Sequence, residues 1–314
     1  MRKLNLLWEL IILVFLVGVL TDEAGASNRS GAVSGLFLKL PVSTRAAGMG
    51  NAQVALAEGA LSIAYNPAGT LSIEGASFGS TYNQWFADIT HAFFGAAVKL
   101  EGLGTIGVGA TVLATDDMNV TTPAFPEGTG QMFKASEIAY TVSYAKQISE
   151  LFGIGLSAKY ITSNLFNKEL NSNSIAFDIG TLYDIPILRT RLGISVNNLG
   201  RDLKYINEQY SLPTSLRFGA RTVILQEEMH KVLAVFQIAR PNDADEQYNL
   251  GAEYTAYDVV SLRGGYKFNY DTEDWSAGLG VNLKSIGITG SVDYSYNHYK
   301  LLPATNMFSI EIGF

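Results

Sequence analysis

Apolar and polar residues alternate along most of the chain after residue 75. In residues 175–183, mostly isoleucine, phenylalanine and tyrosine occupy the odd positions, while alanine, aspartate, glycine and leucine occupy the even ones. Residues 260–269 and 288–297 show the same period of two. Such a period predicts β-strands whose two faces meet different surroundings. No stretch after the N-terminus runs 18 apolar residues without a break, so the pattern indicates strands and not membrane helices.

The pattern predicts about fourteen strands, most of about ten residues, which is long enough for a tilted strand to cross a bilayer. The predicted strands are residues 76–86, 88–100, 103–114, 136–148, 151–164, 173–185, 190–198, 214–225, 229–239, 246–257, 258–269, 274–284, 285–298 and 304–314. Aromatic residues such as Tyr254, Tyr257 and Trp275 lie near strand ends, where an amphipathic ring can sit at the headgroup level. Alternation alone, however, is compatible with a soluble sandwich as well as a membrane barrel.

The lengths of the connections favour the membrane barrel. Even-numbered gaps are short, as at Glu101-Gly102 and Ser149-Glu150, whereas odd-numbered gaps include the long stretches 114–136 and 198–213. The first odd gap, at Ala87, is short and breaks the pattern. Tight periplasmic turns and longer outer loops produce this alternation in outer-membrane barrels, and a sandwich gives no reason for it. An even strand number also brings both ends of the barrel to the periplasmic side.

The first 26 residues predict an export signal. Arg2 and Lys3 precede an apolar stretch from Leu6 to Leu20, and Ala24-Gly25-Ala26 supplies small residues for cleavage. Glu9 interrupts the apolar stretch, and an N-terminal membrane anchor is the alternative. The sequence therefore predicts three parts, which are a signal peptide at 1–26, a luminal hatch at 27–72 and a transmembrane antiparallel barrel at 73–314.

Composition excludes several classes of protein. The chain has no cysteine, so it has no disulfides, thiolate metal sites or lipoprotein anchor. Its net charge is −7, and no basic patch predicts a nucleic-acid partner. No carboxylate cluster has the spacing of a calcium loop, and we expect no metal or cofactor. The Gly48-Met49-Gly50 run lacks the third glycine and the preceding strand of a dinucleotide site.

The chain ends in alternating apolar residues that we interpret as a signal for membrane assembly. Phe308, Ile310, Ile312 and the carboxy-terminal Phe314 occupy alternate positions of the last predicted strand. This ending resembles the one by which bacterial barrels are recognised for insertion into the outer membrane. Together with the predicted export signal, it indicates a protein of the bacterial outer membrane, with membrane lipid as its first partner.

Two motifs before the first strand resemble the opening of the PorV/PorQ family. The first is the run 37–50, which contains Arg45, Gly48 and Gly50, and the second is Asn66-Pro67-Ala68-Gly69. Members of this family are outer-membrane barrels associated with type IX secretion and related to the FadL fatty-acid transporters. Glu58-Gly59 departs from the family, which often has paired acidic residues there, and Thr70 stands where a leucine is common. The resemblance covers about 35 residues and implies the broad family rather than the role of its best-known member.

The same residues permit a hatch on physical grounds. Asn66 can bond its own backbone, Pro67 fixes φ, and Gly69 tolerates positive φ, so the motif predicts a rigid turn. Gly48 and Gly50 would let the backbone pack closely inside a ring of strands. An ordinary structural turn beneath the barrel is the alternative to a gating role.

The chemistry-bearing residues indicate a non-enzymatic protein. Only His91, His230 and His298 could serve a hydrolase as base, and His91 and His298 are predicted on apolar strand faces. Charges predicted on the luminal faces indicate ion pairs and bonds to the hatch rather than an anion-attracting lining. These charges are Lys99, Lys159, Asp178, Arg217, Arg221, Glu253, Arg263, Lys267, Asp293 and Glu311.

Two functions follow from the sequence. The family resemblance implies an accessory or cargo-handling component of type IX secretion, with translocon subunits or secreted cargo as partners. The alternative is a FadL-like passive transporter of hydrophobic small molecules, which would require an apolar pocket near the outer loops or an opening in the wall.

Overall fold

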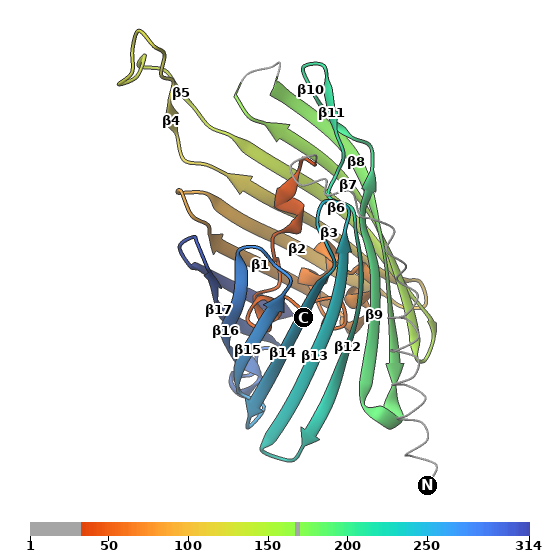
Figure 1. The fold of residues 1–314 in the computed structure, drawn as a ribbon. Helices are drawn as coiled ribbons and strands as arrows, with labels where there is room; N and C mark the ends of the chain where they lie inside the picture. Colours follow the sequence, from red (N-terminus) through yellow and green to blue (C-terminus); the bar gives the residue numbers. More distant parts are fainter. Residues whose placement is uncertain (1–32, 167–169) are drawn as a thin grey trace.

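The computed structural model describes residues 33–166 and 170–314, and the predicted signal peptide at 1–26 lies outside these residues. Fourteen strands form one closed antiparallel barrel, in the order β1-β18-β17-β16-β15-β14-β13-β12-β9-β8-β7-β6-β3-β2 (Figure 1). The predicted fold class and strand number are confirmed. Within the described residues, no helix is both long and apolar enough to cross a membrane.

The barrel strands lie close to the predicted ranges. They are β1 (Ala76–Gln84), β2 (Thr90–Leu100), β3 (Gly104–Ala114), β6 (Ser136–Ser149), β7 (Phe152–Asn164), β8 (Asn171–Ile185), β9 (Thr190–Gly200), β12 (Ser215–Gln226), β13 (His230–Pro241), β14 (Gln247–Ala256), β15 (Val260–Phe268), β16 (Glu273–Asn282), β17 (Gly290–Tyr299) and β18 (Thr305–Gly313). The largest difference is at β17, which begins at Gly290 and not at residue 285, because the 3-10 helix η6 (Leu283–Ile286) occupies the turn before it.

Turns are short at one end of the barrel and longer at most connections of the other. Two long loops carry small hairpins of their own, β4 (Met118–Asn119) with β5 (Met132–Phe133), and β10 (Leu203–Tyr205) with β11 (Glu208–Tyr210). Both hairpins project from the top of the barrel in Figure 1. At the short-turn end, η5 (Pro186–Leu188) forms part of the connection between β8 and β9.

The barrel closes where its first and last strands meet. β1 pairs with β18 from Ser77↔Gly313 to Gln84↔Asn306. The backbone N–H groups of Ala76 and Phe314 each donate to the other residue's carbonyl, at 3.0 and 2.8 Å. The two ends of the barrel therefore lie together at its short-turn end, as the even strand number predicts.

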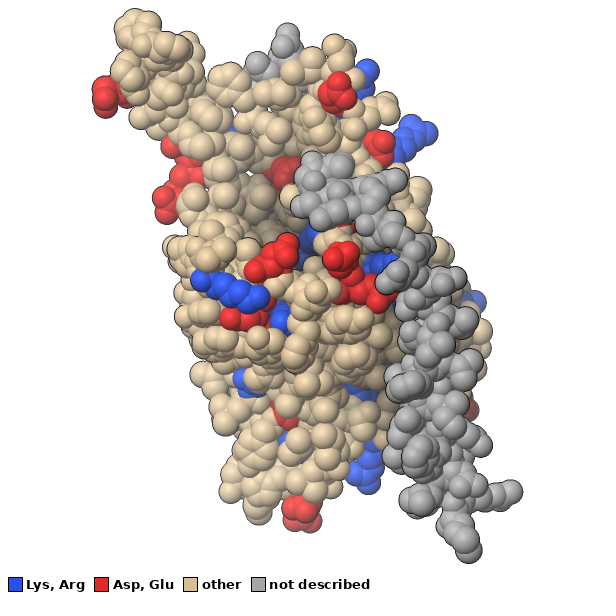
Figure 2. All heavy atoms as spheres, in the orientation of Figure 1, with Lys and Arg blue, Asp and Glu red and all other residues tan. Residues whose placement is uncertain are grey.

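The two faces of the wall differ as the alternation predicts. On β8, Ile175, Phe177 and Ile179 point outward with 42–54 % of their surface exposed, whereas Asp178 between them is fully buried. Large apolar side chains are exposed in the same way on every barrel strand from β1 to β18. In Figure 2 the charged side chains on the visible face gather mainly in its upper half, toward the long loops. A wall with an apolar exterior and a polar interior suits a lipid surrounding.

Residues 33–75 lie inside the ring of strands, and we call them the N-terminal segment. It contains η1 (Leu36–Lys39), the single-turn helix α2 (Thr44–Ala47), η2 (Ala60–Ala64) and η3 (Pro67–Ser72). Short helical turns joined by loops are what its small, weakly periodic residues predict. Most of its side chains are buried, including Ala46, Met49 and Ile63, so the segment forms the core of the barrel interior (Figure 1).

Candidate functional site in the barrel interior

The N-terminal segment contacts strands all around the barrel. Helix α2 lies against β16, β17 and β18, the turn η2 lies against β1, β2, β3 and β6, and η3 lies against β3, β6, β7 and β8. Residues 50–54 reach the remaining side, where Asn249 of β14 and Gln237 of β13 bond their backbone. The interface between this segment and the inner wall is the candidate functional site.

Glycines in the wall allow the segment's backbone to lie directly against the strands. A Cβ on Gly155 would come within 2.3 Å of the Ala68 nitrogen, and one on Gly193 within 2.6 Å of the Val54 oxygen. Other inward-facing glycines with such contacts below 3.0 Å to the segment are Gly79, Gly107, Gly153, Gly180, Gly219, Gly251 and Gly265. Where the near atom belongs to the segment's backbone, as at Gly155, Gly193, Gly251 and Gly265, a larger residue would force the segment away from the wall.

Gly48 and Gly50 hold the segment against β14, β15 and β16. Gly48 packs on Gly278, where an added Cβ would lie 3.0 Å from the partner's Cα. Gly50 has a φ of +68°, which favours glycine, and its Cβ would lie 2.8 Å from the carbonyl oxygen of Leu250. Its N–H donates to Ser276 Oγ at 2.9 Å, and its carbonyl accepts from Asn249 Nδ2 at 2.6 Å. Both predicted close approaches are therefore present.

Arg45 joins the segment to the wall by ion pairs. Its Nε and Nη2 donate to the two carboxylate oxygens of Glu253 at 2.9 and 2.6 Å, and its Nη1 donates to Glu58 at 2.9 Å. Glu253 also accepts from Arg263, whose Nη1 bonds Asp293 at 2.6 Å. Burial alone would lower the pKa of Arg45, but Glu253 and Glu58 raise it well above its usual value. The result is a chain of alternating charges from α2 across β14 and β15 to β17.

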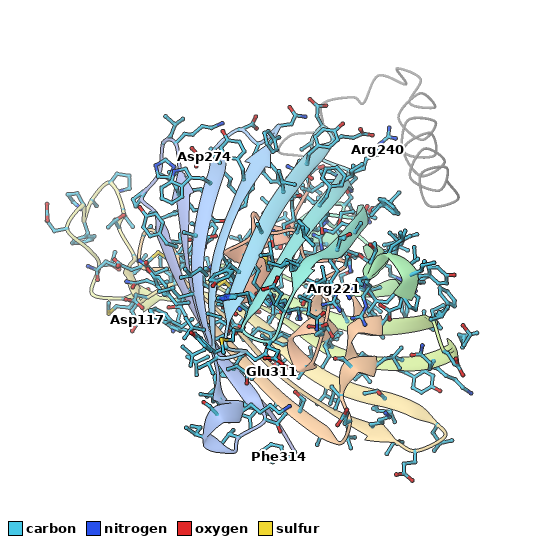
Figure 3. All side chains as sticks on the ribbon, turned by 90° about the horizontal axis from the view of Figure 1, so that it is seen from below. Asp117, Arg221, Arg240, Asp274, Glu311 and Phe314 are labelled. Carbon is cyan, nitrogen blue, oxygen red and sulfur yellow. The ribbon has the colours of Figure 1, made fainter. Side chains whose placement is uncertain are left out.

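Glu58 also forms ion pairs with two arginines on another side of the barrel. Arg221 of β12 lies 2.7 Å from its carboxylate and Arg191 of β9 lies 3.4 Å away. Burial alone would raise the pKa of Glu58, but Arg221, Arg45 and Arg191 lower it to about 2. Viewed from below, Arg221 and Glu311 lie beside the N-terminal segment (Figure 3). Glu58 therefore links Arg45 of the segment to the arginines of β9 and β12 through ion pairs.

Glu311 adds a further attachment. Its Oε1 accepts from the Ala60 N–H at 2.5 Å and from Ser77 Oγ at 3.0 Å. Gly59, with a φ of +67°, leaves the space that the carboxylate occupies, since a Cβ there would lie 1.7 Å from Oε1. Through Glu311, the last strand of the barrel thus bonds both the N-terminal segment and the first strand.

The motif Asn66-Pro67-Ala68-Gly69 begins η3. The Asn66 side chain is fully buried, accepts from the Ala68 N–H at 3.3 Å, and donates to the carbonyls of Val54 and Thr181 at 2.9 and 3.3 Å. Pro67 is the first residue of the helix, where a missing N–H costs nothing. Gly69 does not use its tolerance of positive φ, because the residue continues the 3-10 helix. Glycine is required there by space, since a Cβ would lie 2.6 Å from Ser62 Cβ.

Most of the predicted luminal charges lie in ion pairs. The buried pair of Lys159 and Asp178 is 2.7 Å long, and Asn198 bonds both side chains. Lys267 pairs with Glu273 across β15 and β16. Lys99 is exposed at the short-turn end. Arg217 differs because it is buried, and yet none of the described residues forms an ion pair or hydrogen bond with its side chain.

The prediction for His91 is wrong, whereas the one for His298 is confirmed. His91 points inward and is 1 % exposed, beside the inward Phe93, because β2 carries apolar residues on both faces and the pattern there does not distinguish them. His298 lies on the outer face and stacks on Trp275. In the described residues, no three histidine, aspartate or glutamate side chains are placed to hold a metal ion.

The proposed assembly residues share the outer face of β18. Phe308 and Ile310 are 51 and 38 % exposed, and Phe314 is 82 % exposed beyond the strand's end. Phe314 lies away from the N-terminal segment in Figure 3. These positions agree with the predicted alternation, and their role in assembly stays a prediction.

Sequence reasoning missed the partners that complete the network. Arg191 and Asp184 form an ion pair at 2.6 Å beside Glu58. From the sequence, Glu58 was noted only because it differs from the family pattern, and its ion pairs were not predicted. The wall glycines were visible as small residues on polar strand faces. These glycines share the inward faces of the strands with polar residues, and that pattern could have indicated that another backbone lies against the wall.

A family model for the type IX secretion system protein PorV matches residues 24–240, which is more than half of the chain. The chain belongs to the PorV family. Its resemblance to PorV/PorQ is thus confirmed, and membership together with the closed barrel indicates the outer membrane. No curated protein sequence matches the chain.

Solved structures similar to this PorV-family barrel share its fold at low sequence identity. The toluene transporter TodX of Pseudomonas putida has a TM-score of 0.60 and 11 % identity, covering 86 % of this chain and 96 % of its own. The toluene transporter TbuX of Ralstonia pickettii has a TM-score of 0.57 and 13 % identity, covering 87 % and 98 %. A FadL homologue of Pseudomonas aeruginosa has a TM-score of 0.52 and 12 % identity, with the same coverage as TbuX. At these identities the likeness shows a FadL-like barrel fold alone.

Proposed function

We propose that this protein is a non-enzymatic accessory of type IX secretion that handles secreted cargo or contacts the translocon at the outer surface of the membrane. The observation that carries the proposal is the match to the PorV family over residues 24–240. The filled interior supports it, because a segment bonded to the wall at Arg45, Glu58 and Asn66 leaves little room for a protein to pass. Cargo would therefore meet the loops and not the lumen.

The proposal is tested in the host by deleting the gene and measuring where type IX cargo accumulates. Cargo should remain in the periplasm and disappear from the cell surface, and the wild-type gene should restore it. The test needs a genome that also encodes the large translocon and proteins with its sorting domain. Normal surface display in the deletion strain would contradict the proposal.

The hatch role is tested separately in planar bilayers. Removing residues 27–72 should raise the conductance of the purified barrel, because the segment occupies the lumen. Wild-type protein and the variant Gly264→Ala, whose change points outward, serve as controls. Equal conductance before and after the deletion would contradict the hatch.

A passive transporter of hydrophobic small molecules is the second candidate. The fold shared with the transporters TodX and TbuX favours it. Uptake of a small aromatic hydrocarbon by vesicles containing the protein would support this function. The secretion test and the uptake test give independent answers, since cargo display does not depend on hydrocarbon flux.

The terminal aromatic residue is proposed to assist membrane assembly. Replacing Phe314 with alanine should lower the fraction of barrel recovered in the outer membrane, whereas Leu301→Ala in an exposed loop should not. Leu301 is 83 % exposed and Phe314 82 %, so the control is matched for exposure. Normal insertion of Phe314→Ala would contradict this role.

A further inference from the structure

A narrow, partly open cavity lies between the N-terminal segment and the inner wall. Phe37, Leu40 and Val42 of the segment form its apolar side. Its polar side contains Gln53 of the segment, Thr111 of β3 and Arg217 of β12. The space admits one small particle, of the size of a water molecule or slightly larger.

Arg217 has no bonding partner in this cavity. It is 9 % exposed, and within residues 33–166 and 170–314 its guanidinium makes no hydrogen bond or ion pair. Asp178 and Tyr270 are the acidic groups in electrostatic range. Asp178 is already bonded to Lys159 at 2.7 Å, and the Tyr270 hydroxyl is bonded to Asn249 at 3.0 Å. An unpaired buried cation is costly, so a site that keeps one is expected to hold a counter-ion.

The other polar residues at the cavity can also donate. Gln53 is 3 % exposed, and its side-chain oxygen has no partner in the described part of the chain. Because the oxygen and nitrogen of an amide can exchange places by a flip, Gln53 can turn its NH₂ group toward the cavity. Thr111 is 6 % exposed, and its hydroxyl makes no hydrogen bond within the described residues.

The remaining groups at the cavity do not neutralise Arg217. Lys159 also lies at the cavity, but Asp178 and Asn198 satisfy it. Tyr65 also lies at the cavity, and burial raises the pKa of its hydroxyl, so it carries no charge that could offset Arg217. The cavity therefore offers one uncompensated positive charge, two further donors and no uncompensated carboxylate.

We propose that this cavity binds one small monovalent anion of about the size of chloride. The anion would join Arg217 of β12 and Thr111 of β3 to Gln53 of the N-terminal segment, and so would fasten the segment to opposite parts of the wall. This inference does not depend on the proposed function. The cavity's size favours a free ion over the carboxylate end of a larger molecule.

Thermal unfolding of the full protein in detergent tests the proposal. At constant ionic strength, replacing sodium gluconate with sodium chloride should raise the apparent unfolding temperature by about 2–4 °C. Arg217→Met should lose this response, and in gluconate it should unfold at a higher temperature than the wild type, since the unpaired charge is gone. Thr111→Val should weaken chloride affinity by about fivefold. Arg240→Met, at an arginine with 54 % of its side chain exposed, should respond to chloride as the wild type does.

Three results would overturn the proposal. One is a wild type that shows no chloride response, and another is an Arg217→Met variant that keeps the full response, which would indicate a general salt effect. The third is a response to octanoate without a response to chloride, which would assign the site to the carboxylate of a larger molecule. Crystals grown in bromide supply a direct check, because anomalous scattering should place one ion beside Arg217 and none there in Arg217→Met.

Discussion

The two faces of the same strands are specified in different ways. On β15, Leu262 and Tyr266 face outward, 51 and 43 % exposed. Neither side chain makes a hydrogen bond or ion pair within the described residues. On the inward face, Arg263 bonds both Glu253 and Asp293, and Lys267 pairs with Glu273. The outer face requires only a class of side chain, whereas the inner face requires particular residues at particular positions.

Glycine shows the same contrast at adjacent positions. Gly264 faces outward, and nothing lies within 4 Å of an added Cβ. Gly265 faces inward, where an added Cβ would come within 2.0 Å of the Gly50 nitrogen. The space beside the outward glycine is thus empty, whereas the space beside the inward glycine is filled by the backbone of the N-terminal segment.

The largest loss is expected when the inner charges are broken. Arg45→Met leaves Glu253, which is 5 % exposed, with Arg263 alone, and should lower the free energy of unfolding by about 3 kcal/mol. Arg240→Met removes an exposed pair 3.8 Å long and should cost less than about 1 kcal/mol. Urea unfolding in detergent measures both, and similar costs would contradict the distinction between the faces.

A smaller effect is expected from the paired glycines. Gly265→Ala forces the backbone at residues 49 and 50 away from the wall and should cost about 1–3 kcal/mol. Gly264→Ala enters open space and should change stability by about 0.5 kcal/mol or less. Unfolding midpoints of the two variants decide the matter, and an equal loss in both would show that strand propensity, not packing, sets the cost.

A pH-dependent effect is expected at Glu58. Its carboxyl pKa falls from 4.5 to about 2 in the folded protein, so the folded state favours the charged form. The stabilisation is present above pH about 4.5 and is lost as the pH falls toward 2. Glu58→Gln should remove this part of the pH dependence. Unfolding temperatures of both proteins from pH 6 to pH 3 test this, and parallel curves would contradict it.

Much of the wall could be predicted from the sequence. The faces of residues 175–183, 260–269 and 288–297 were predicted correctly, because lipid on one side and a polar interior on the other impose a period of two. His91 was misplaced because β2 has apolar residues on both faces, where the period carries no information. Turn details such as η6 depend on local backbone geometry that the period does not describe.

The interior could be predicted only in part. The close approaches of Gly48 and Gly50 follow from the residues themselves. Their partners do not, because Arg45 and Glu253 are 208 residues apart, and pairing at that separation leaves no local signal. The same holds for Glu58, whose arginines belong to β9 and β12.

The N-terminal segment is attached to both β1 and β18, the two strands that close the barrel. This attachment constrains the order in which the molecule can fold. Residue 76 begins β1 directly after the segment, and Glu311 of β18 bonds Ala60 within it. A closed wall whose glycines already touch the segment leaves little room for the 43 residues of the segment to enter later. The chain must therefore wrap its last strands around its own beginning. Such long-range closure predicts slow folding, whose final step is the meeting of the first and last strands.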